Sequence, residues 1–136
     1  MPKTIIVPVA LAQIEKVHAM LEVAKQLGGE DGQIVLVTVI EEVPGYIAAE
    51  LPAGLLESAA EDARAEMRKI GRDAGMELPV EVRKGNPASG ILAVASERHA
   101  DVIVIASHRP GLQDYFLGST AARVVRHATC SVHVIR

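Results

Sequence analysis

The sequence predicts an α/β fold, with a single doubly wound parallel sheet of five strands flanked by four helices. Short β-branched runs such as Thr4–Val9 and Gln33–Ile40 are mostly apolar, which is typical of strands covered on both faces. Between such runs lie segments whose apolar residues recur every three or four positions, as they do on an amphipathic helix. Strands that alternate with helices in this way indicate a parallel sheet with helical crossovers.

The first forty residues contain a strand, a helix and a second strand. Thr4–Val9 is the first strand, and residues 12–27 form a helix that Gly28-Gly29 ends. Gln33–Ile40 is the second buried strand. The expected apolar stripe of the helix consists of Ile14, Val17, Leu21 and Ala24.

The middle of the chain is expected to hold a loop, a long helix and a third strand. Residues 41–54 contain two prolines and two glycines and read as a loop. Residues 55–74 carry an apolar stripe flanked by pairs of opposite charge at helical spacing, such as Glu61 and Arg64. Residues 79–84 complete this part as a strand.

The last fifty residues repeat the alternation. Gly85-Asn86-Pro87 is a turn that leads into a helix reaching about His99. Val102–Ala106 is the fourth strand, Ser119–His127 the last helix, and Ser131–Ile135 the fifth strand.

Length and composition limit the class of protein. At 136 residues the chain is expected to form one domain, residues 1–136. Its apolar runs are too short for a membrane span, and Met1-Pro2-Lys3 leads directly into a strand, so no signal peptide is expected. The single cysteine, Cys130, cannot form an internal disulfide and favours a cytoplasmic setting. A net charge of −3 and only three aromatic residues argue against nucleic-acid binding.

Ligands of doubly wound sheets bind beyond the carboxyl ends of the strands, where the strand order reverses. Here those ends are Ala10, Glu41, Lys84-Gly85 and Ser107-His108-Arg109. The helix beginning near Gly118-Ser119-Thr120 would offer unpaired backbone N–H groups and two hydroxyls to a phosphate there. Arg109 would add a charge-assisted contact. Ser119 has a second interpretation, as an N-cap that needs no ligand.

Several motifs, taken together, resemble the universal stress protein family over nearly the whole chain. They are Ile6–Val9, Thr38–Ile40, Gly85-Asn86-Pro87, Ala100–Val104, Leu117-Gly118-Ser119, Val124–Ala128 and Cys130–Val134. The resemblance implies an adenine-nucleotide α-hydrolase-like fold with strand order 3-2-1-4-5. It also implies homodimers paired through the last strand, here Ser131–Ile135, and ATP binding through a Gly-x2-Gly-x9-Gly-Ser/Thr motif.

This chain departs from that motif. Ala106 and Arg109 stand where the family has its first two glycines, and only eight residues separate Arg109 from Gly118. Ala10 stands where family members that bind nucleotide tend to carry an aspartate that contacts the nucleoside. The shortened Ala-Ser-His-Arg-Pro loop resembles a branch of small members to which nucleotide binding is also attributed, and there the arginine would replace the glycines as phosphate ligand.

The resemblance and the strand ends together predict a cytoplasmic, dimeric regulator of the stress response that binds ATP, or AMP or ADP, with Mg²⁺ as an optional companion. The adenine would lie against aliphatic side chains, and the phosphates would lie over the loop after the fourth strand and the start of the last helix. The predicted binding residues are Val9, Ala10, Val39, Gly85, Ser107, His108, Arg109, Gly118, Ser119 and Thr120. The alternative is a nucleotide-free dimeric module of the same fold that acts through protein partners.

Enzymatic and metal-dependent chemistry find little support in the sequence. The five histidines are scattered, without an acidic partner at ligand spacing, so no metal site is expected. Ser107 and His108 are sequence neighbours with no evident oxyanion-stabilising group. Any ATP hydrolysis or autophosphorylation would be slow and secondary.

Overall fold

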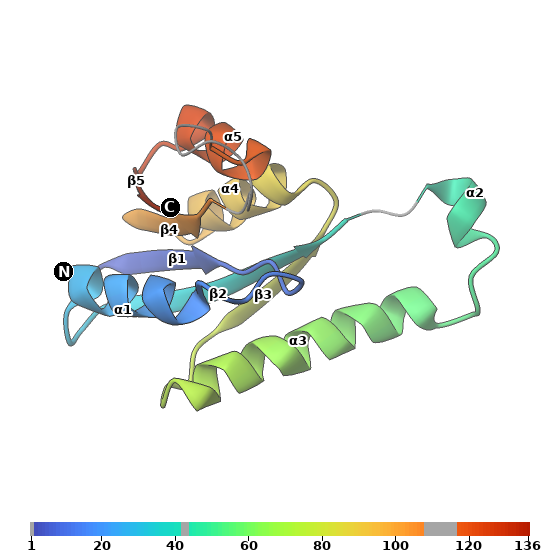
Figure 1. Ribbon diagram of the computed structural model, residues 1–136, viewed down its shortest axis with the longest axis horizontal. Helices are drawn as coiled ribbons and strands as arrows, with labels where there is room; N and C mark the ends of the chain where they lie inside the picture. The colour runs from blue at the N-terminus through green and yellow to red at the C-terminus, as the bar shows by residue number, and fades with distance from the viewer. Residues whose placement is uncertain (1, 42–43, 108–116) are drawn as a thin grey trace.

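A computed structural model describes residues 2–41, 44–107 and 117–136. It contains the predicted five-stranded sheet with all neighbouring strands parallel and in the order β3-β2-β1-β4-β5 (Figure 1). The strands are β1 (Thr4–Pro8), β2 (Gln33–Ile40), β3 (Val80–Lys84), β4 (Val102–Ala106) and β5 (Ser131–Ile135).

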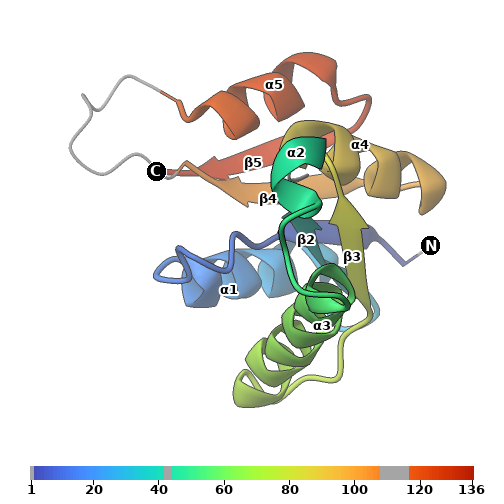
Figure 2. The ribbon, with the colours of Figure 1, turned by 90° about the vertical axis from the view of Figure 1, so that its right-hand side faces the viewer.

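Helices cover both faces of the sheet. They are α1 (Val17–Gly28), α2 (Gly45–Ala48), α3 (Leu55–Asp73), α4 (Pro87–Glu97) and α5 (Ser119–His127). Side chains of α1 and α3 form one core cluster with the sheet, and side chains of α4 and α5 form the other. Figure 2 shows these two pairs of helices on opposite sides of the sheet. None of the helices in these ranges is long and apolar enough to cross a membrane.

The central strand β1 holds the two halves of the sheet together. It is in register with β2 along its whole length, from the pair Thr4–Gln33 to the pair Pro8–Val37. With β4 it is in register only at Ile5–Val102 and Ile6–Ile103. Beyond Ile6, therefore, β1 stays with β2, since Val9 N–H still donates to Val37 O at 2.7 Å, whereas its pairing with β4 ends. This divergence lies at the carboxyl edge, where the strand order reverses.

The first helix begins later than predicted. The chain after β1 makes two tight turns, in which Gln13 N–H donates to Ala10 O and Val17 N–H to Ile14 O. These bonds span three residues, as in a turn and not an α-helix, so α1 begins at Val17 and Ile14 remains 53% exposed. The predicted apolar stripe is correct from Val17 onward and wrong for Ile14.

The segment predicted as a loop at 41–54 contains an additional short helix, α2, so five helices are described where four were expected. Its first residue follows Pro44, whose missing N–H costs nothing at a helix start. Figure 1 shows α2 projecting beyond the amino-terminal end of α3, away from the sheet. Tyr46 there is 77% exposed, so α2 adds no core.

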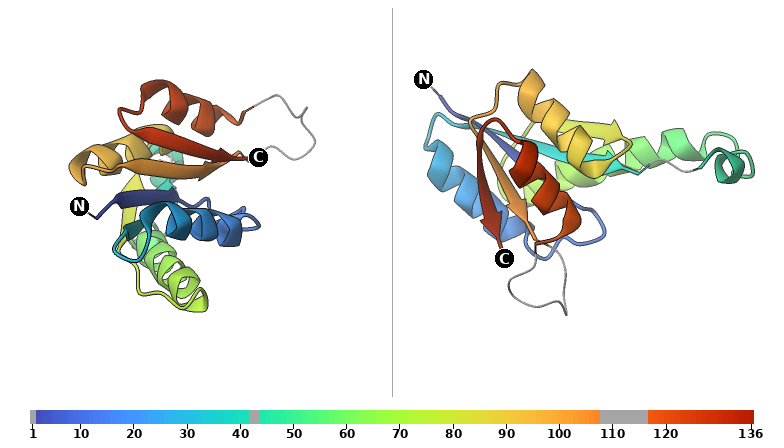
Figure 3. Two further views of the ribbon diagram at one scale, coloured as in Figure 1. Left: turned by 90° about the vertical axis from the view of Figure 1, so that its left-hand side faces the viewer. Right: turned by 90° about the horizontal axis from the view of Figure 1, so that it is seen from above.

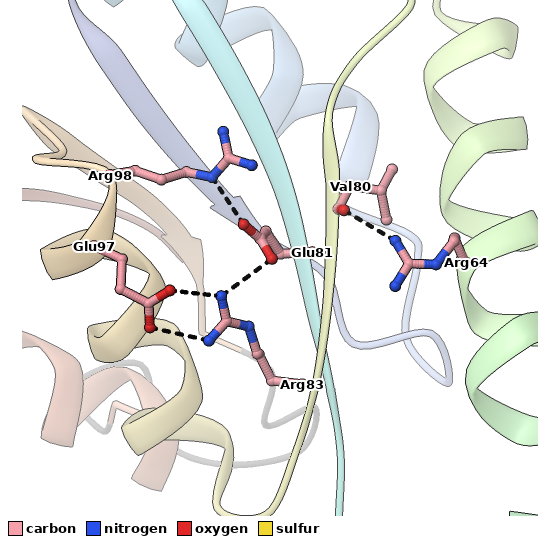
Figure 4. Close-up of polar contacts among 6 residues, drawn as sticks. All are labelled: Arg64, Val80, Glu81, Arg83, Glu97 and Arg98. Atoms are coloured by element: carbon pink, nitrogen blue, oxygen red, sulfur yellow. Dashed lines mark hydrogen bonds and ion pairs between the residues drawn. The ribbon is translucent and has the colours of Figure 1, made fainter. Parts of the chain in front are cut away.

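A network of ion pairs ties α4 to the edge strand β3 (Figure 4). Arg83 of β3 donates from both Nη atoms to the carboxylate of Glu97, at 3.0 and 2.8 Å, and also to Glu81 at 3.1 Å. Arg98 Nε donates to the other oxygen of Glu81 at 2.9 Å. Partial burial raises the pKa of Glu81, but the hydrogen bonds from Arg98 and Arg83 outweigh it, and the net shift is downward.

Glu81→Gln should lower the free energy of unfolding by about 1 kcal/mol at pH 7, because the pair is only partly shielded from water. The pKa of Glu81 is lower in the folded state, so its contribution is complete above the unfolded-state pKa and disappears as pH falls through the folded-state pKa. Urea unfolding at pH 7 and pH 3 measures this. The exposed Glu77→Gln is the control, and a difference from wild type that persists undiminished at pH 3 would contradict the assignment.

Candidate functional site

A cavity opens at the carboxyl edge of the sheet, where β1 and β4 diverge. Its volume is about 460 Å³, within the range of small-molecule sites. The ends of β1, β2 and β4 form its floor, and the first turns of α4 and α5 close its other side. Its lining residues are Pro8, Val9, Ala10, Leu11, Ala12, Gln13, Val37, Thr38, Val39, Ile40, Glu41, Pro87, Ile91, Ile105, Ala106, Gly118, Ser119, Thr120 and Ala121.

One end of the cavity is aliphatic. Val9 and Val37 are buried, Val39 lies at the end of β2, and Ile91 of α4 packs with Val37 and Val39 in one core cluster. Thr38 and Glu41 bring polar side chains to this wall, the first buried and the second exposed. Such a surface fits a flat heteroaromatic ring with a polar substituent at its edge.

The other end of the cavity is the start of α5. Gly118 is the N-cap residue and Ser119 and Thr120 are the first two helical residues, so the N–H groups of Ser119 and Thr120 have no partner within the helix. The hydroxyl of Ser107, which follows β4, accepts the N–H of Gly118 at 3.1 Å. The interpretation of Ser119 as the N-cap is therefore wrong: Gly118 occupies that position, and Ser107 supplies the hydroxyl from a distant part of the chain.

A lysine lies beside this helix start. Lys16, the N-cap residue of α1, donates from Nζ to the carbonyl oxygen of Ser107 at 3.2 Å. Ser107 thus links the amino-terminal ends of two helices, accepting from Lys16 with its carbonyl and from Gly118 with its hydroxyl. An ammonium group and the positive end of the α5 dipole thus both lie at one residue, an arrangement that favours an anion.

The predicted site residues divide into three groups. Those that line the cavity are Val9, Ala10, Val39, Gly118, Ser119 and Thr120. Gly85 and Ser107 are described but do not line it: Gly85, at φ 118°, turns the chain between β3 and α4, and Ser107 lies behind the start of α5. His108 and Arg109 lie outside the described residues.

Three polar residues of the site were not predicted. Gln13 and Thr38 line the cavity, and Lys16 contacts Ser107. Thr38 was the easiest to find, because a polar residue within the apolar run of β2 is unusual. Lys16 carries no such signal, since its partner is 91 residues away in the sequence. Within 2–41, 44–107 and 117–136, no three His, Cys, Asp or Glu side chains are grouped so as to hold a metal ion.

Comparisons with known proteins agree with this architecture. The family model of the universal stress protein family matches residues 1–136. The chain belongs to the universal stress protein family. Two similar relatives are a universal stress protein of Methanocaldococcus jannaschii, 30% identical over 98% of this chain and 82% of its own, and universal stress protein G of Salmonella typhimurium, 31% identical over the full length of both.

Solved structures of the family share the fold of this universal stress protein. UspA from Lactobacillus plantarum superposes with a TM-score of 0.75 at 25% identity, covering 98% of this chain and 97% of that one. An Archaeoglobus fulgidus member in complex with dAMP gives 0.66 at 22% identity, with 98% of both chains covered. A further member was solved in complex with cAMP, with a TM-score of 0.62 at 17% identity over 99% of this chain and 97% of that one.

The hydrogen bond between Ser107 and Gly118 distinguishes two serines of the site. Ser107→Ala should destabilise this universal stress protein by about 1 kcal/mol, because the Gly118 N–H loses its acceptor at a partly buried helix start. Ser119→Ala should change stability by less than about 0.5 kcal/mol, since no side chain caps the helix from that position. Urea unfolding of both variants measures the difference, and equal effects would contradict the geometry.

Proposed function

We propose that this universal stress protein is a regulatory protein of the stress response that binds adenine nucleotides, ATP first and AMP or ADP also. The observation that carries the proposal is the cavity between diverging β1 and β4, aliphatic at one end and bordered by the amino terminus of α5 at the other. Family members of the same fold have been solved with dAMP and with cAMP, both of which carry adenine and one phosphate.

The base would occupy the aliphatic end. Val9 and Val39 would contact its two faces, and backbone groups at the end of β2 would be available to its edge. Ala10 gives the ribose no carboxylate, but Glu41 and Gln13 line the same cavity and would bond the ribose hydroxyls instead. The missing aspartate at position 10 therefore does not leave the sugar without polar partners.

The phosphates would lie at the start of α5. The N–H groups of Ser119 and Thr120 and their hydroxyls would bond the phosphate oxygens. Lys16 would supply a positive charge, and Arg109 is proposed as a second one on the strength of its sequence position. Mg²⁺ would accompany a triphosphate as its counter-ion. We assign no catalytic residue.

The test begins with mass spectrometry of small molecules released from freshly purified protein, followed by calorimetric titration with ATP and AMP. We expect co-purified adenine nucleotide or micromolar affinity. Lys16→Ala and Arg109→Ala should each weaken ATP binding about tenfold or more, since each loses a charge-assisted contact, and should weaken AMP binding less.

Lys25→Ala is the matched control, because Lys25 lies in the helix that Lys16 caps but pairs with Glu22 at 3.6 Å, whereas Lys16 bonds Ser107. The Lys25→Ala variant should bind ATP and AMP with the affinity of the wild type. A protein that carries no nucleotide and does not bind ATP up to millimolar concentration would refute the proposal. It would favour instead a nucleotide-free module that acts through protein partners.

We also propose that the protein is a cytoplasmic homodimer paired through β5, which lies at the edge of the sheet (Figure 3). Toward β4, Ser131 N–H donates to Asp101 O, and Ile135 O accepts from Ser107 N–H. Backbone groups alternate in direction along a strand, so those of Val132 and Val134 face outward and would pair with a second copy.

Val132→Pro should convert the dimer to a monomer, because proline removes one outward N–H while leaving the bonds of Ser131 and Ile135 to β4 in place. Light scattering at micromolar concentration measures the mass. Val132→Thr retains the N–H and the branched shape and should remain dimeric. A strictly monomeric mass for the wild type would rule the dimer out.

A further inference from the structure

Gly90, in the interior of α4, is the point at which this helix approaches the sheet closely. A Cβ built on Gly90 would lie 2.7 Å from Cγ2 of Val39 and 3.4 Å from its Cγ1, and 3.6 Å from Cβ of Arg83. Carbon atoms pack at about 3.5–4.0 Å, so no other residue fits position 90 unless its surroundings move. A glycine inside a helix is otherwise less favourable than alanine, so the close approach gives its presence here a physical reason.

The surroundings that would move belong to the cavity. Val39 lines it from β2, and Pro87 and Ile91 line it from the turns of α4 on either side of Gly90. Gly90 does not itself line the cavity. Because Gly90 has no side chain, Val39 can occupy its present position between the sheet and α4.

Two attachments hold α4 at this distance from the sheet. Just before its amino-terminal end, the N–H of Gly85 donates to the carbonyl oxygen of Ile40 in β2 at 2.9 Å. At its carboxyl-terminal end Glu97 accepts two hydrogen bonds from Arg83 of β3 (Figure 4). A methyl group at position 90 would therefore displace Val39 more readily than it would lift the helix. Because a β-branched side chain is stiff about χ1, Val39 would move as a unit.

We propose that Gly90 is a positioning residue for the base of the bound nucleotide: it lets α4 pack closely while Val39 leaves room for adenine. This inference rests on the adenine-nucleotide binding proposed above and extends it to a residue outside the cavity lining. It concerns the base end, since Val39 lies at the end of β2 whereas the phosphates would lie at the start of α5. A change at position 90 should therefore weaken ATP and AMP equally.

The experiment compares Gly90→Ala with the double variant Val39→Ala/Gly90→Ala, in which removal of the two Val39 methyl groups makes room for the new one. Calorimetry should show ATP and AMP each weakened about tenfold or more in Gly90→Ala, with their affinity ratio unchanged. The double variant should bind better than Gly90→Ala and match Val39→Ala alone, because both lose the contact of Val39 with the base but the double variant has no clash. A general loss of packing would be worsened, and not relieved, by the additional truncation of Val39.

Gly45→Ala is the matched control, because a Cβ at Gly45 meets nothing within 4 Å and Gly45 does not line the cavity. Thermal unfolding of every variant separates loss of binding from loss of folding. If the wild type binds nucleotide and Gly90→Ala binds it equally well, only the role of Gly90 is overturned. If the double variant binds no better than Gly90→Ala, the contact with Val39 is overturned. If the wild type binds no adenine nucleotide, both proposals fall.

Discussion

The unequal pairing of β1 with its two neighbours is the constraint on which the site depends. β1 is the only strand of the described sheet whose two neighbours, β2 and β4, both come later in the sequence. It remains in register with β2 to Pro8 but with β4 only to Ile6. The helical connections that follow β1 and β4 lead to opposite halves of the sheet. The space beyond the point where the two strands part is therefore filled by neither half of the fold. The cavity results from the strand order itself.

Much of this fold could be predicted from local pattern. β2, β4, α5 and β5 have the predicted bounds because each is a short apolar run or a periodic segment with a clear signal at both ends. The start of α1 was wrong because the spacing of Ile14 to Val17 fits a helix as well as it fits a tight turn. Periodicity cannot distinguish the two when no capping side chain marks the start of the helix.

The site could be predicted only in part, for a related reason. Strand ends and a Gly-Ser-Thr helix start are local features, so Val9, Val39, Gly118, Ser119 and Thr120 could be named in advance, and all five line the cavity. The contacts of Ser107 with Lys16 and Gly118 depend on how α1, β4 and α5 pack. The space that Gly90 leaves for Val39 depends likewise on how α4 packs on β2. No spacing within the chain encodes such contacts.

The cavity owes its size to small side chains. Ala10, Ala12, Ala106, Gly118 and Ala121 line it, and no aromatic side chain is among the described lining residues. A planar ring there would gain dispersion and hydrophobic contacts from branched aliphatic groups, but no stacking. The shape of this end must then provide most of the selection for a base. Aliphatic walls offer no directional contacts, so the distance between them decides which ring fits. Charge would provide the selection for a phosphate at the opposite end, where Lys16 and the start of α5 both contact Ser107. In this arrangement β2 and α4 would set the width of the slot, and Lys16 and the start of α5 would set the electrostatic potential at its other end.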